Sequence, residues 1–428
     1  MAVSTVHRQP LGEAVGDLLS GRDPRWRQDP YPPYERLRIE QPVFRFQPRI
    51  VLVSRYADVK AVRLDTEIVA PRELVIKHES RAARLGDEEL ALYKEIVEFM
   101  SLMLSRHDGE QHRDYRNALQ RAFIPKQVAE WPAMVHAIVD EEIARLPRDG
   151  VIDLMPFALR VPLLVIMALM GAPVEDAERV KHWGDGIIEA ISVVPLDPDL
   201  VRSGARRIRE YREYARVMIR RLRAEESEAR TSVISLLLGA GDSDRLSNDQ
   251  IVATFMHFLF AGHETTANLI GNGALRLLAE PAQWRLLSSD PERYSADSVE
   301  EALRHEPPSQ ITPRETTSAT EIGGIPIEAG VSVQMVNAAA NRDPDAFEDP
   351  DHFDIQRGRA DHMALGLGRH YCLGAPLARL EGRIAFETLA RRFPELELAG
   401  DPDRLEWRPQ PRLRGLTALP VRLGRDRG

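Results

Sequence analysis

Residues 364–374, ALGLGRHYCLG, contain Cys372, which is the only cysteine in a chain of 428 residues. Gly366 and Gly368 precede it, and glycine both adopts positive φ and lets a flat group approach the backbone closely. Residues 375–393, APLARLEGRIAFETLARRF, have the pattern of a helix. The N–H groups at the start of such a helix would stabilise a thiolate. A thiolate with space for a flat group beside it is what ligation of haem iron by cysteine requires.

The composition of the chain is that of a folded protein without disulfides. Hydrophobic residues make up 43% and charged residues 29%, as in ordinary globular proteins with a large core. A single cysteine excludes an intramolecular disulfide. The formal net charge of -9 argues against nucleic-acid binding and leaves small molecules or basic protein surfaces as partners.

No segment has the pattern of a secretion signal or a membrane span. The first residues, MAVSTVHRQPLGEAV, lack the charged and then apolar order of a signal peptide. The most apolar stretch, residues 161–174, is shorter than the roughly 20 residues that cross a bilayer. We therefore expect a cytoplasmic protein that does not enter membranes.

The pattern along the chain predicts an α+β fold, mainly α with small β-sheets. Residues 43–56 contain a β-branched run, whereas residues 88–305 have mainly helical spacing. Residues 323–334, GGIPIEAGVSVQ, predict a hairpin, and residues 341–362 predict a long loop. A loop of this length is unusual unless it serves a site, and this one leads directly to Cys372.

We expect one domain over residues 24–428, preceded by a flexible N-terminal segment, residues 1–23. Residues 246–281 predict its longest helix, because Ser247 and Gln250 have the spacing of a capping box. The centre of this helix is apolar on nearly all sides but contains Glu264, and a buried carboxylate is costly without partners. Two interpretations stay open on this pattern alone: Glu264 belongs to a site, or it pairs with a distant arginine.

Several segments together resemble the bacterial cytochrome P-450 family of haem-thiolate monooxygenases, in the family's order from about residue 24 to 423. The cysteine loop resembles the haem-binding loop of that family, and residues 261–266, AGHETT, resemble its oxygen-activation motif. Glu301 and Arg304 match its Glu-x-x-Arg pair, on one face of a helix. The resemblance implies a single-domain fold with haem b between the long helix and the cysteine loop.

The resemblance also implies a role for each matching residue. Cys372 would ligate the haem iron, and Glu264 and Thr265 would be the catalytic residues that deliver protons. Four side chains would bind the haem propionates: His112, Arg116, Arg314 and His370. Further cofactor contacts would come from Ala261, Leu365, Gly366 and Gly374. A structural network would consist of Glu301, Arg304 and Arg357.

Leu365 departs from the family pattern. The family usually has phenylalanine seven residues before the cysteine, so the packing beside the thiolate and the reduction potential of the iron would differ here.

The implied function is the insertion of one oxygen atom from O2 into an apolar small molecule, by hydroxylation or epoxidation, in secondary metabolism. The substrate would be bound by residues 70–107, 184–205 and 257–261. Five further residues would line the same pocket: Gln310, Ile311, Thr312, Leu416 and Thr417.

The resemblance implies partners as well as a substrate. Electrons from NAD(P)H would arrive through a ferredoxin reductase and a ferredoxin, and the enzyme would be a monomer. Arg113, Arg121, Lys126 and Arg369 could form a basic docking face, or could be ordinary solvated charges.

Two alternative functions stay open. The chain could be a peroxide-driven or ring-coupling haem-thiolate enzyme, although the proton-delivering pair Glu264 and Thr265 argues against this. It could also be a haem-binding sensor without catalysis. Turnover with a reducing system and a substrate panel separates these functions.

Overall fold

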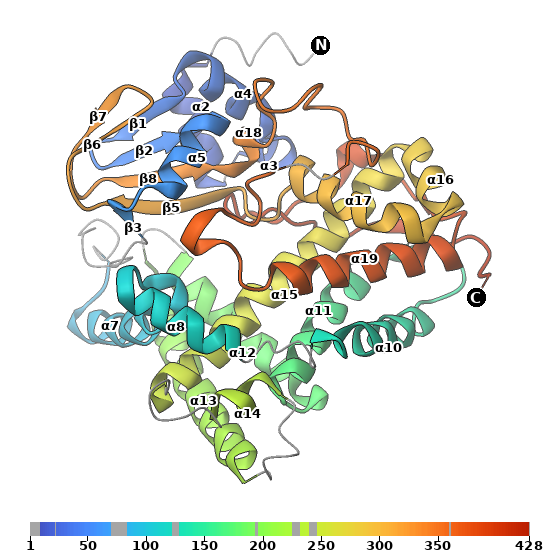
Figure 1. The fold of residues 1–428 in the computed structure, drawn as a ribbon, viewed down its shortest axis with the longest axis horizontal. Helices are drawn as coiled ribbons and strands as arrows, with labels where there is room; N and C mark the ends of the chain where they lie inside the picture. Colours follow the sequence, from blue (N-terminus) through green and yellow to red (C-terminus); the bar gives the residue numbers. More distant parts are fainter. Residues whose placement is uncertain are drawn as a thin grey trace. The chain divides into compact units, whose positions relative to one another are not determined.

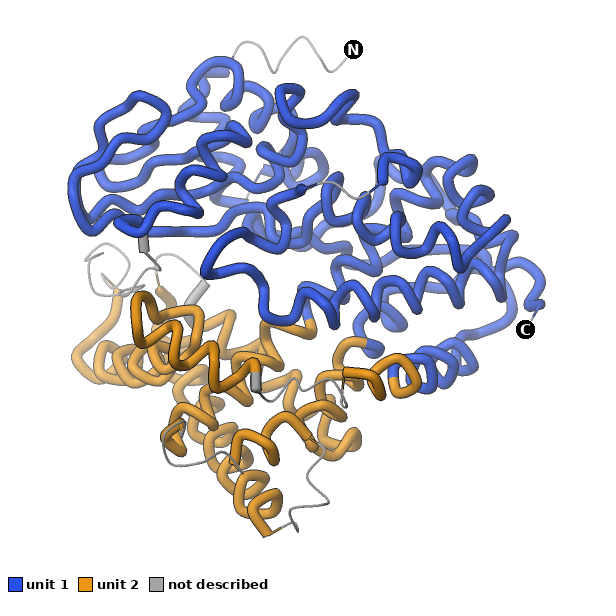
Figure 2. Tube along the Cα trace, viewed as in Figure 1, with its two compact units in different colours: residues 1–69, 135–161, 264–428 blue, residues 70–134, 162–263 orange. Residues whose placement is uncertain are grey.

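The computed structural model describes residues 9–21, 23–69, 84–121, 128–192, 196–224, 232–238, 246–358 and 361–427. They fall into two compact units (Figure 2). The first unit comprises residues 1–69, 135–161 and 264–428, and the second comprises residues 70–134 and 162–263. Helices predominate and the sheets are small (Figure 1), which confirms the predicted fold class.

Eight of the α-helices lie entirely in the described part of the first unit. They are α2 (Leu11–Ser20), α3 (Pro24–Gln28), α4 (Tyr31–Glu40), α5 (Tyr56–Leu64), α16 (Pro281–Ser289), α17 (Pro291–His305), α18 (Asn337–Ala340) and α19 (Ala375–Arg392). Short 3-10 helices cover Gly368–His370 and Pro402–Arg404. Between α18 and Gly368 the described residues form only turns and bends, so the predicted long loop is present.

All strands of the described chain belong to the first unit and form three sheets. The largest has the order β1-β2-β8-β5-β3, with β2 and β8 parallel and the other neighbours antiparallel. Its strands are β1 (Val43–Gln47), β2 (Ile50–Val53), β3 (Ile68–Val69), β5 (Ile311–Thr316) and β8 (Ser332–Val336). The other two sheets consist of β4 (Ile152–Asp153), β10 (Pro420–Arg422) and β9 (Glu397–Leu398), and of β6 (Thr320–Ile322) and β7 (Ile325–Ile327).

The predicted hairpin over residues 323–334 is wrong in its extent. The strands that pair are β6 and β7, and the turn between them is Gly323-Gly324. Both glycines have positive φ, 56° and 79°, which suits the tight turn of a two-residue hairpin. The predicted range begins at the turn and so omits β6, and β8, at its end, pairs with β2 and β5 instead.

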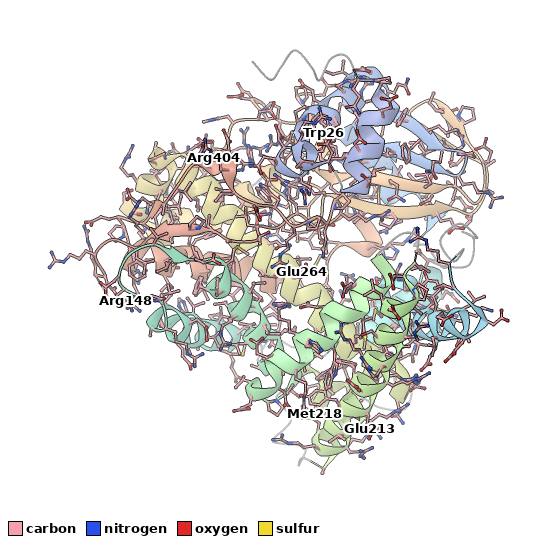
Figure 3. The ribbon with its side chains drawn as sticks, turned by 180° about the vertical axis from the view of Figure 1, so that it is seen from behind. Trp26, Arg148, Glu213, Met218, Glu264 and Arg404 are labelled. Carbon is pink, nitrogen blue, oxygen red and sulfur yellow. The ribbon has the colours of Figure 1, made fainter. Side chains whose placement is uncertain are left out.

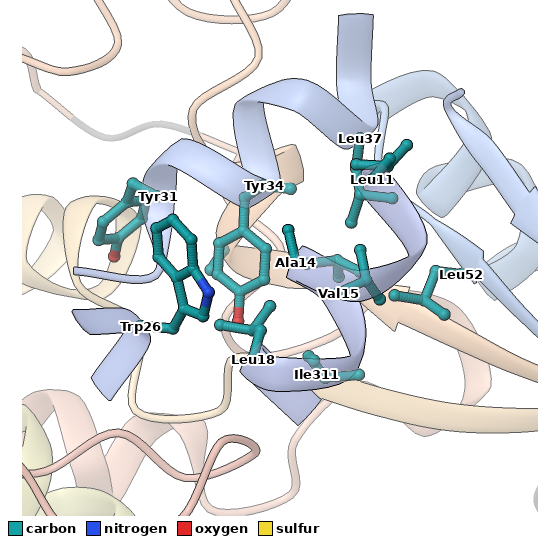
Figure 4. Close-up of a cluster of buried hydrophobic side chains, with 13 residues drawn as sticks. Leu11, Ala14, Val15, Leu18, Trp26, Tyr31, Tyr34, Leu37, Leu52 and Ile311 are labelled. Atoms are coloured by element: carbon teal, nitrogen blue, oxygen red, sulfur yellow. The ribbon is translucent and has the colours of Figure 1, made fainter. Parts of the chain in front are cut away.

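The N-terminal residues take part in the core of the first unit. Residues 11–20, which we expected to lie outside the domain, form α2, and its Leu11, Ala14, Val15 and Leu18 are buried. This spacing places all four on one face of a helix. They pack with Trp26, Tyr34, Leu52 and other residues of α3, α4 and the large sheet (Figure 4). The packed part of the chain therefore begins at residue 11 or earlier.

The second unit is helical in its described residues. Its helices are α7 (Asp87–Ser101), α8 (Gly109–Arg121), α12 (Ala177–Ser192), α13 (Pro198–Arg223) and α14 (Val233–Leu238), with 3-10 turns at Leu104–Arg106 and Val174–Asp176. Within it, α13 is tied to α7 by an ion pair between Arg209 and Glu95 at 2.5 Å. Trp183 of α12 donates a hydrogen bond to Glu210 of α13 at 2.8 Å.

Three helices have residues in both units: α10 (Trp131–Ala144), α11 (Met155–Met170) and α15 (Asn248–Ala279). α15 has 32 residues and is therefore about 48 Å long at 1.5 Å per residue. The predicted capping box is confirmed, since Gln250 N–H donates to Ser247 Oγ at 3.1 Å and Ser247 N–H donates to Gln250 Oε1 at 2.8 Å. Nowhere in the described ranges does a helix combine the length and the hydropathy that a membrane span needs.

Candidate active site

The loop around Cys372 is held by a few short backbone hydrogen bonds. The N–H of Cys372 donates to the carbonyl of Leu365 at 2.8 Å, and the N–H of Gly366 donates to the carbonyl of Met363 at 3.1 Å. Gly366 and Gly368 have φ angles of 78° and 68°, which other residues rarely adopt. The predicted need for glycine at these two positions therefore follows from the backbone itself.

The same glycines also let helix α5 approach the loop. A Cβ built on Gly366 would lie 3.1 Å from Nη1 of Arg63 and 3.2 Å from the carbonyl oxygen of His370. A Cβ on Gly368 would lie 3.3 Å from the carbonyl oxygen of Arg63. These distances are tight for carbon, so a side chain at either position would push α5 away.

Helix α19 begins directly after the loop, as its pattern predicts. Ala375 is its first residue, and the N–H of Ala378 donates to the carbonyl of Gly374 at 2.9 Å. A Cβ built on Gly374 would lie 4.0 Å from Sγ of Cys372, so the sulfur lies close to the start of this helix. The helix dipole favours negative charge there. Cys372 is half-buried.

Arg379 fixes the loop from α19. It donates to Tyr371 Oη at 2.6 Å and forms an ion pair with Glu300 of α17, with Nε 2.5 Å from Oε1. His362 Nε2 lies 3.3 Å from the other oxygen of the same carboxylate. Burial raises the pKa of Glu300, but the hydrogen bonds from His362 and Arg379 outweigh it and lower the pKa to about 2. The residue before Cys372 is therefore tied to α17 through one ionised carboxylate.

The three residues of the predicted structural network lie together. Arg304 binds both oxygens of Glu301, at 2.7 and 2.8 Å, and Arg357 Nε donates to Glu301 at 3.4 Å. Arg304 is 0% exposed and Glu301 is 2% exposed. Arg304 also donates to the carbonyls of Asn341, Pro350 and His352, at 3.1, 2.7 and 3.0 Å. The network thus holds the long loop that leads to Cys372.

Glu264 has a partner within the first unit. It projects from α15 (Figure 3), and its Oε1 lies 3.3 Å from Nη1 of Arg408. Their side chains are 18% and 26% exposed. The pairing with a distant arginine, one of the two interpretations left open by the sequence, is therefore present. It leaves a catalytic role open as well, because the carboxylate and the neighbouring Thr265 are both half-buried.

The other predicted cofactor residues are divided between the units. Arg314, on β5, and His370, in the 3-10 turn, belong to the first unit with Cys372. His112 and Arg116 lie four residues apart on α8 of the second unit, where His112 is buried and Arg116 half-buried. Ala261, also in the second unit, is exposed although it lies in the middle of α15. The approach of these three residues to Cys372 stays a prediction.

Most of the predicted pocket residues of the first unit are packed inside it. Gln310, Ile311 and Leu416 are buried, and Ile311 belongs to the core that contains α2. Thr312 is half-buried and accepts a hydrogen bond from Arg63 at 3.2 Å, whereas Thr417 is exposed. The predicted pocket ranges 184–205 and 257–261 lie in the second unit, and residues 70–83 and 193–195 lie outside the described residues.

The predicted basic docking face is only partly described. Arg113 is exposed and pairs with Glu110 at 3.2 Å, while Arg369 donates to the carbonyls of Asp65 and Ile68 at 3.2 and 3.1 Å. The side chain of Arg121 and the whole of Lys126 lie outside the described residues.

Sequence reasoning missed two cations near the site, Arg63 and Arg408. Arg63 carried a signal, because it continues the buried spacing Val59, Val62, Arg63 on α5, where an apolar residue is expected. Arg408 carried no comparable signal, since its partner Glu264 is 144 residues away.

The first unit fits a haem group at Cys372. A thiolate is a ligand for haem iron, and haem also carries two carboxylates that need cations. Burial, with a smaller contribution from the charge of Arg314, lowers the pKa of Arg63 to about 9. At neutral pH this buried guanidinium beside Gly366 therefore stays charged. A cofactor with anionic groups would compensate such a charge.

Comparisons with known proteins agree with this geometry. The family model described as cytochrome P-450 matches residues 67–285 and 293–414. The chain is 36% identical to a vitamin D(3) 25-hydroxylase of Pseudonocardia autotrophica over 96% of this chain and 98% of that protein. It is 31% identical to the polyketide biosynthesis cytochrome P-450 PksS of Bacillus subtilis, over 93% of this chain and 96% of that protein. Among solved structures, CalO2 superimposes with a TM-score of 0.83 at 30% identity, over 93% of this chain and 97% of the other.

Proposed function

The chain belongs to the cytochrome P-450 monooxygenase family, and we propose that it inserts one oxygen atom from O2 into an apolar small molecule, by hydroxylation or epoxidation. The observation that carries this proposal is the half-buried Cys372 beside the start of α19, in a loop whose glycines have positive φ. This is the environment that a thiolate ligand to haem iron needs.

Haem b would be held by the residues that the resemblance assigns. Cys372 would ligate the iron, and Arg314, His370, His112 and Arg116 would bind the propionates. Haem with a thiolate ligand supplies the activation of dioxygen and the cleavage of its O–O bond.

The protein's own part in this chemistry is proton delivery. Cleavage of the O–O bond consumes protons, and Thr265 with the neighbouring Glu264 would donate them on the apolar side of α15. The ion pair with Arg408 holds the Glu264 carboxylate in one position, and an ionised carboxylate there would relay protons from water to Thr265 rather than store one. Proton delivery also favours dioxygen over peroxide as the oxidant.

The electrons would come from NAD(P)H through a ferredoxin reductase and a ferredoxin. Iron–sulfur clusters are held by about four cysteine thiolates, and this chain has only Cys372. A separate electron-transfer protein is therefore part of the proposal, as are a monomeric enzyme and a cytoplasmic location.

The substrate would be an apolar product of secondary metabolism. The relative from Pseudonocardia autotrophica is named for vitamin D(3), and the relative from Bacillus subtilis is named for polyketide biosynthesis. The substrate class of this chain is inferred from this range of relatives. Spectral titration with a library of polyketides, terpenoids, steroids and fatty acids would identify the ligands that displace water from the site.

The experiment that tests the proposal is the spectrum of the reduced protein with carbon monoxide. Wild-type protein should show the red-shifted Soret band of a thiolate-ligated haem, and Cys372→Ser should lose it, because a serine oxygen is a much weaker donor. A Cys372→Ser variant that keeps the band would refute the ligand assignment. Haem binding without consumption of any added compound in the presence of ferredoxin, its reductase and NAD(P)H would favour a sensor.

A further inference from the structure

Arg63 is a buried cation beside the cysteine loop. It lies near the end of α5, on the same face as Val59 and Val62, and the residue is 7% exposed. A guanidinium carries five N–H donors and no acceptor, and it does not give up its charge at neutral pH. Its surroundings must therefore satisfy both the donors and the charge.

The hydrogen bonds of Arg63 satisfy only part of this demand. Its Nη2 donates to Asn337 Oδ1 at 2.7 Å, to Thr312 Oγ1 at 3.2 Å and to the carbonyl of Met363 at 3.3 Å. All three acceptors are neutral. Buried Nε has no hydrogen-bond partner. Among the described residues no carboxylate forms an ion pair with Arg63. Three other buried arginines, Arg304, Arg342 and Arg414, each pair with a carboxylate, whereas buried Arg38, like Arg63, has no ion pair in the described part of the chain.

The charged neighbour that affects Arg63 is a second cation and not an anion. Arg314 on β5 lies close enough to lower the pKa of Arg63, after the larger effect of burial. Two guanidinium groups therefore share one region next to the loop. A buried charge without a counter-charge is energetically costly, so an anion bound in this region would stabilise the protein.

Nη1 of Arg63 is on the side of the loop glycines. A Cβ on Gly366 would lie only 3.1 Å from Nη1, so the lack of a side chain at this glycine is what lets the guanidinium lie against the loop. Nη1 forms no hydrogen bond with any described residue. Nη1 of Arg63 thus faces the loop that carries Cys372.

We propose that Arg63 binds a carboxylate of the haem, as a cation in addition to those that the resemblance assigns. This inference rests on the proposed function, since it requires haem at Cys372. Arg63 would contribute a charge-assisted hydrogen bond from Nη1, while Nη2 keeps its contacts with Asn337 and Met363. The same side chain would then connect the cofactor to the backbone of the loop.

A purely structural role is the competing explanation. In that case Arg63 only orients Asn337 and the Met363 carbonyl, and its loss would weaken the loop whatever cofactor is bound. The two roles predict different effects of esterifying the haem carboxylates. If Arg63 binds a carboxylate, its loss should weaken the binding of haem but not of esterified haem; if its role is only structural, its loss should weaken the binding of both.

The test compares these two cofactors in apoprotein reconstituted from wild type and from Arg63→Gln. The rate at which cofactor leaves is followed by transfer to excess apomyoglobin, which needs no turnover. With haem, Arg63→Gln should release the cofactor roughly ten- to a hundredfold faster, because a hydrogen bond to a charged group is lost. With haem dimethyl ester, the two proteins should differ by no more than about twofold. Lys60→Gln, which removes an exposed cation from the same helix, should release both cofactors at the wild-type rate.

Equal acceleration with both cofactors, or no acceleration with haem, would overturn the proposal. If Arg63→Gln does not fold, Arg63→Lys replaces it, since lysine keeps the charge but not the planar donors. If Arg63→Lys speeds the release of haem, by less than is expected for Arg63→Gln, and does not speed the release of the dimethyl ester, the proposal is supported. Equal acceleration for both cofactors refutes it. Wild-type protein that binds no haem at all would refute the proposed function instead, so the two failures are distinguishable.

Discussion

Replacing Glu301 by glutamine tests whether the buried network holds the loop that leads to Cys372. The side chain keeps its shape and one oxygen but loses its charge. Glu301 accepts two hydrogen bonds from Arg304, one from Arg357 and one from the N–H of Asp354, at 2.9 Å. Glutamine can satisfy only part of these donors, because its amide nitrogen would face a guanidinium.

The expected loss of stability follows from burial. Arg304 is 0% exposed, so Glu301→Gln leaves a cation without an anion in a place that water does not reach. Breaking a buried pair by changing one partner costs about 3–5 kcal/mol. The exposed pair of Glu110 and Arg113 provides the matched control, because such pairs contribute about 0–1 kcal/mol and Glu110→Gln should change little.

The measurement is the free energy of unfolding in urea, with haem content determined in the same samples. Glu301→Gln should lower the unfolding free energy by about 3–5 kcal/mol and reduce haem incorporation. If Glu301→Gln is as stable as Glu110→Gln, the network does not support the loop and the reasoning from burial is wrong.

Three further predictions concern the site. Glu300→Gln should make the stability of the protein depend less on acid pH. The pKa of Glu300 is lowered from 4.5 to about 2, so its ionised form stabilises the fold above pH 4.5. This contribution is lost as the pH falls toward 2, and glutamine does not make it. Acid unfolding followed by circular dichroism checks this, and an unchanged profile contradicts it. Thr265→Ala should keep haem and substrate binding but release more hydrogen peroxide and less product per NAD(P)H, because general acid help is worth about 10²–10⁴-fold; an unchanged product ratio would remove Thr265 from the mechanism. Arg408→Gln should also lower the product ratio, by releasing Glu264, while the unfolding free energy changes by no more than about 1 kcal/mol; a large stability loss with normal product yield would make the pair structural.

Local patterns were predictable from the sequence because they depend on neighbouring residues. The capping box of α15 needs only Ser247 and Gln250, and the sequence predicted it correctly. The turn glycines of the cysteine loop were recognised for the same reason, since positive φ is a property of single residues. The hairpin was misplaced where two turn signals, at Gly323-Gly324 and Gly330, lie close together.

Contacts between distant segments were not predictable in this way. Arg63 meets Thr312 across 249 residues, and Arg379 meets Glu300 across 79. Such pairs depend on how helices and strands pack, which hydrophobic spacing alone does not determine. The resemblance to a family supplied candidate residues at matching motifs, but Arg63 and Arg408 lie outside those motifs and were therefore missed.

The missed contacts explain how the cysteine loop keeps its shape. Its own backbone hydrogen bonds are few, so its conformation depends on side chains from elsewhere. At one end, the N–H of Met363 donates to Asn341 at 2.6 Å and its carbonyl accepts from Arg63; at the other end, Arg379 binds Tyr371. A thiolate acts at a defined distance from its metal, and a site held from several rigid elements keeps such a distance better than a free loop does. The glycines permit the loop's backbone conformation, and these clamps select it, so a change in any clamp should alter the haem spectrum before it unfolds the protein.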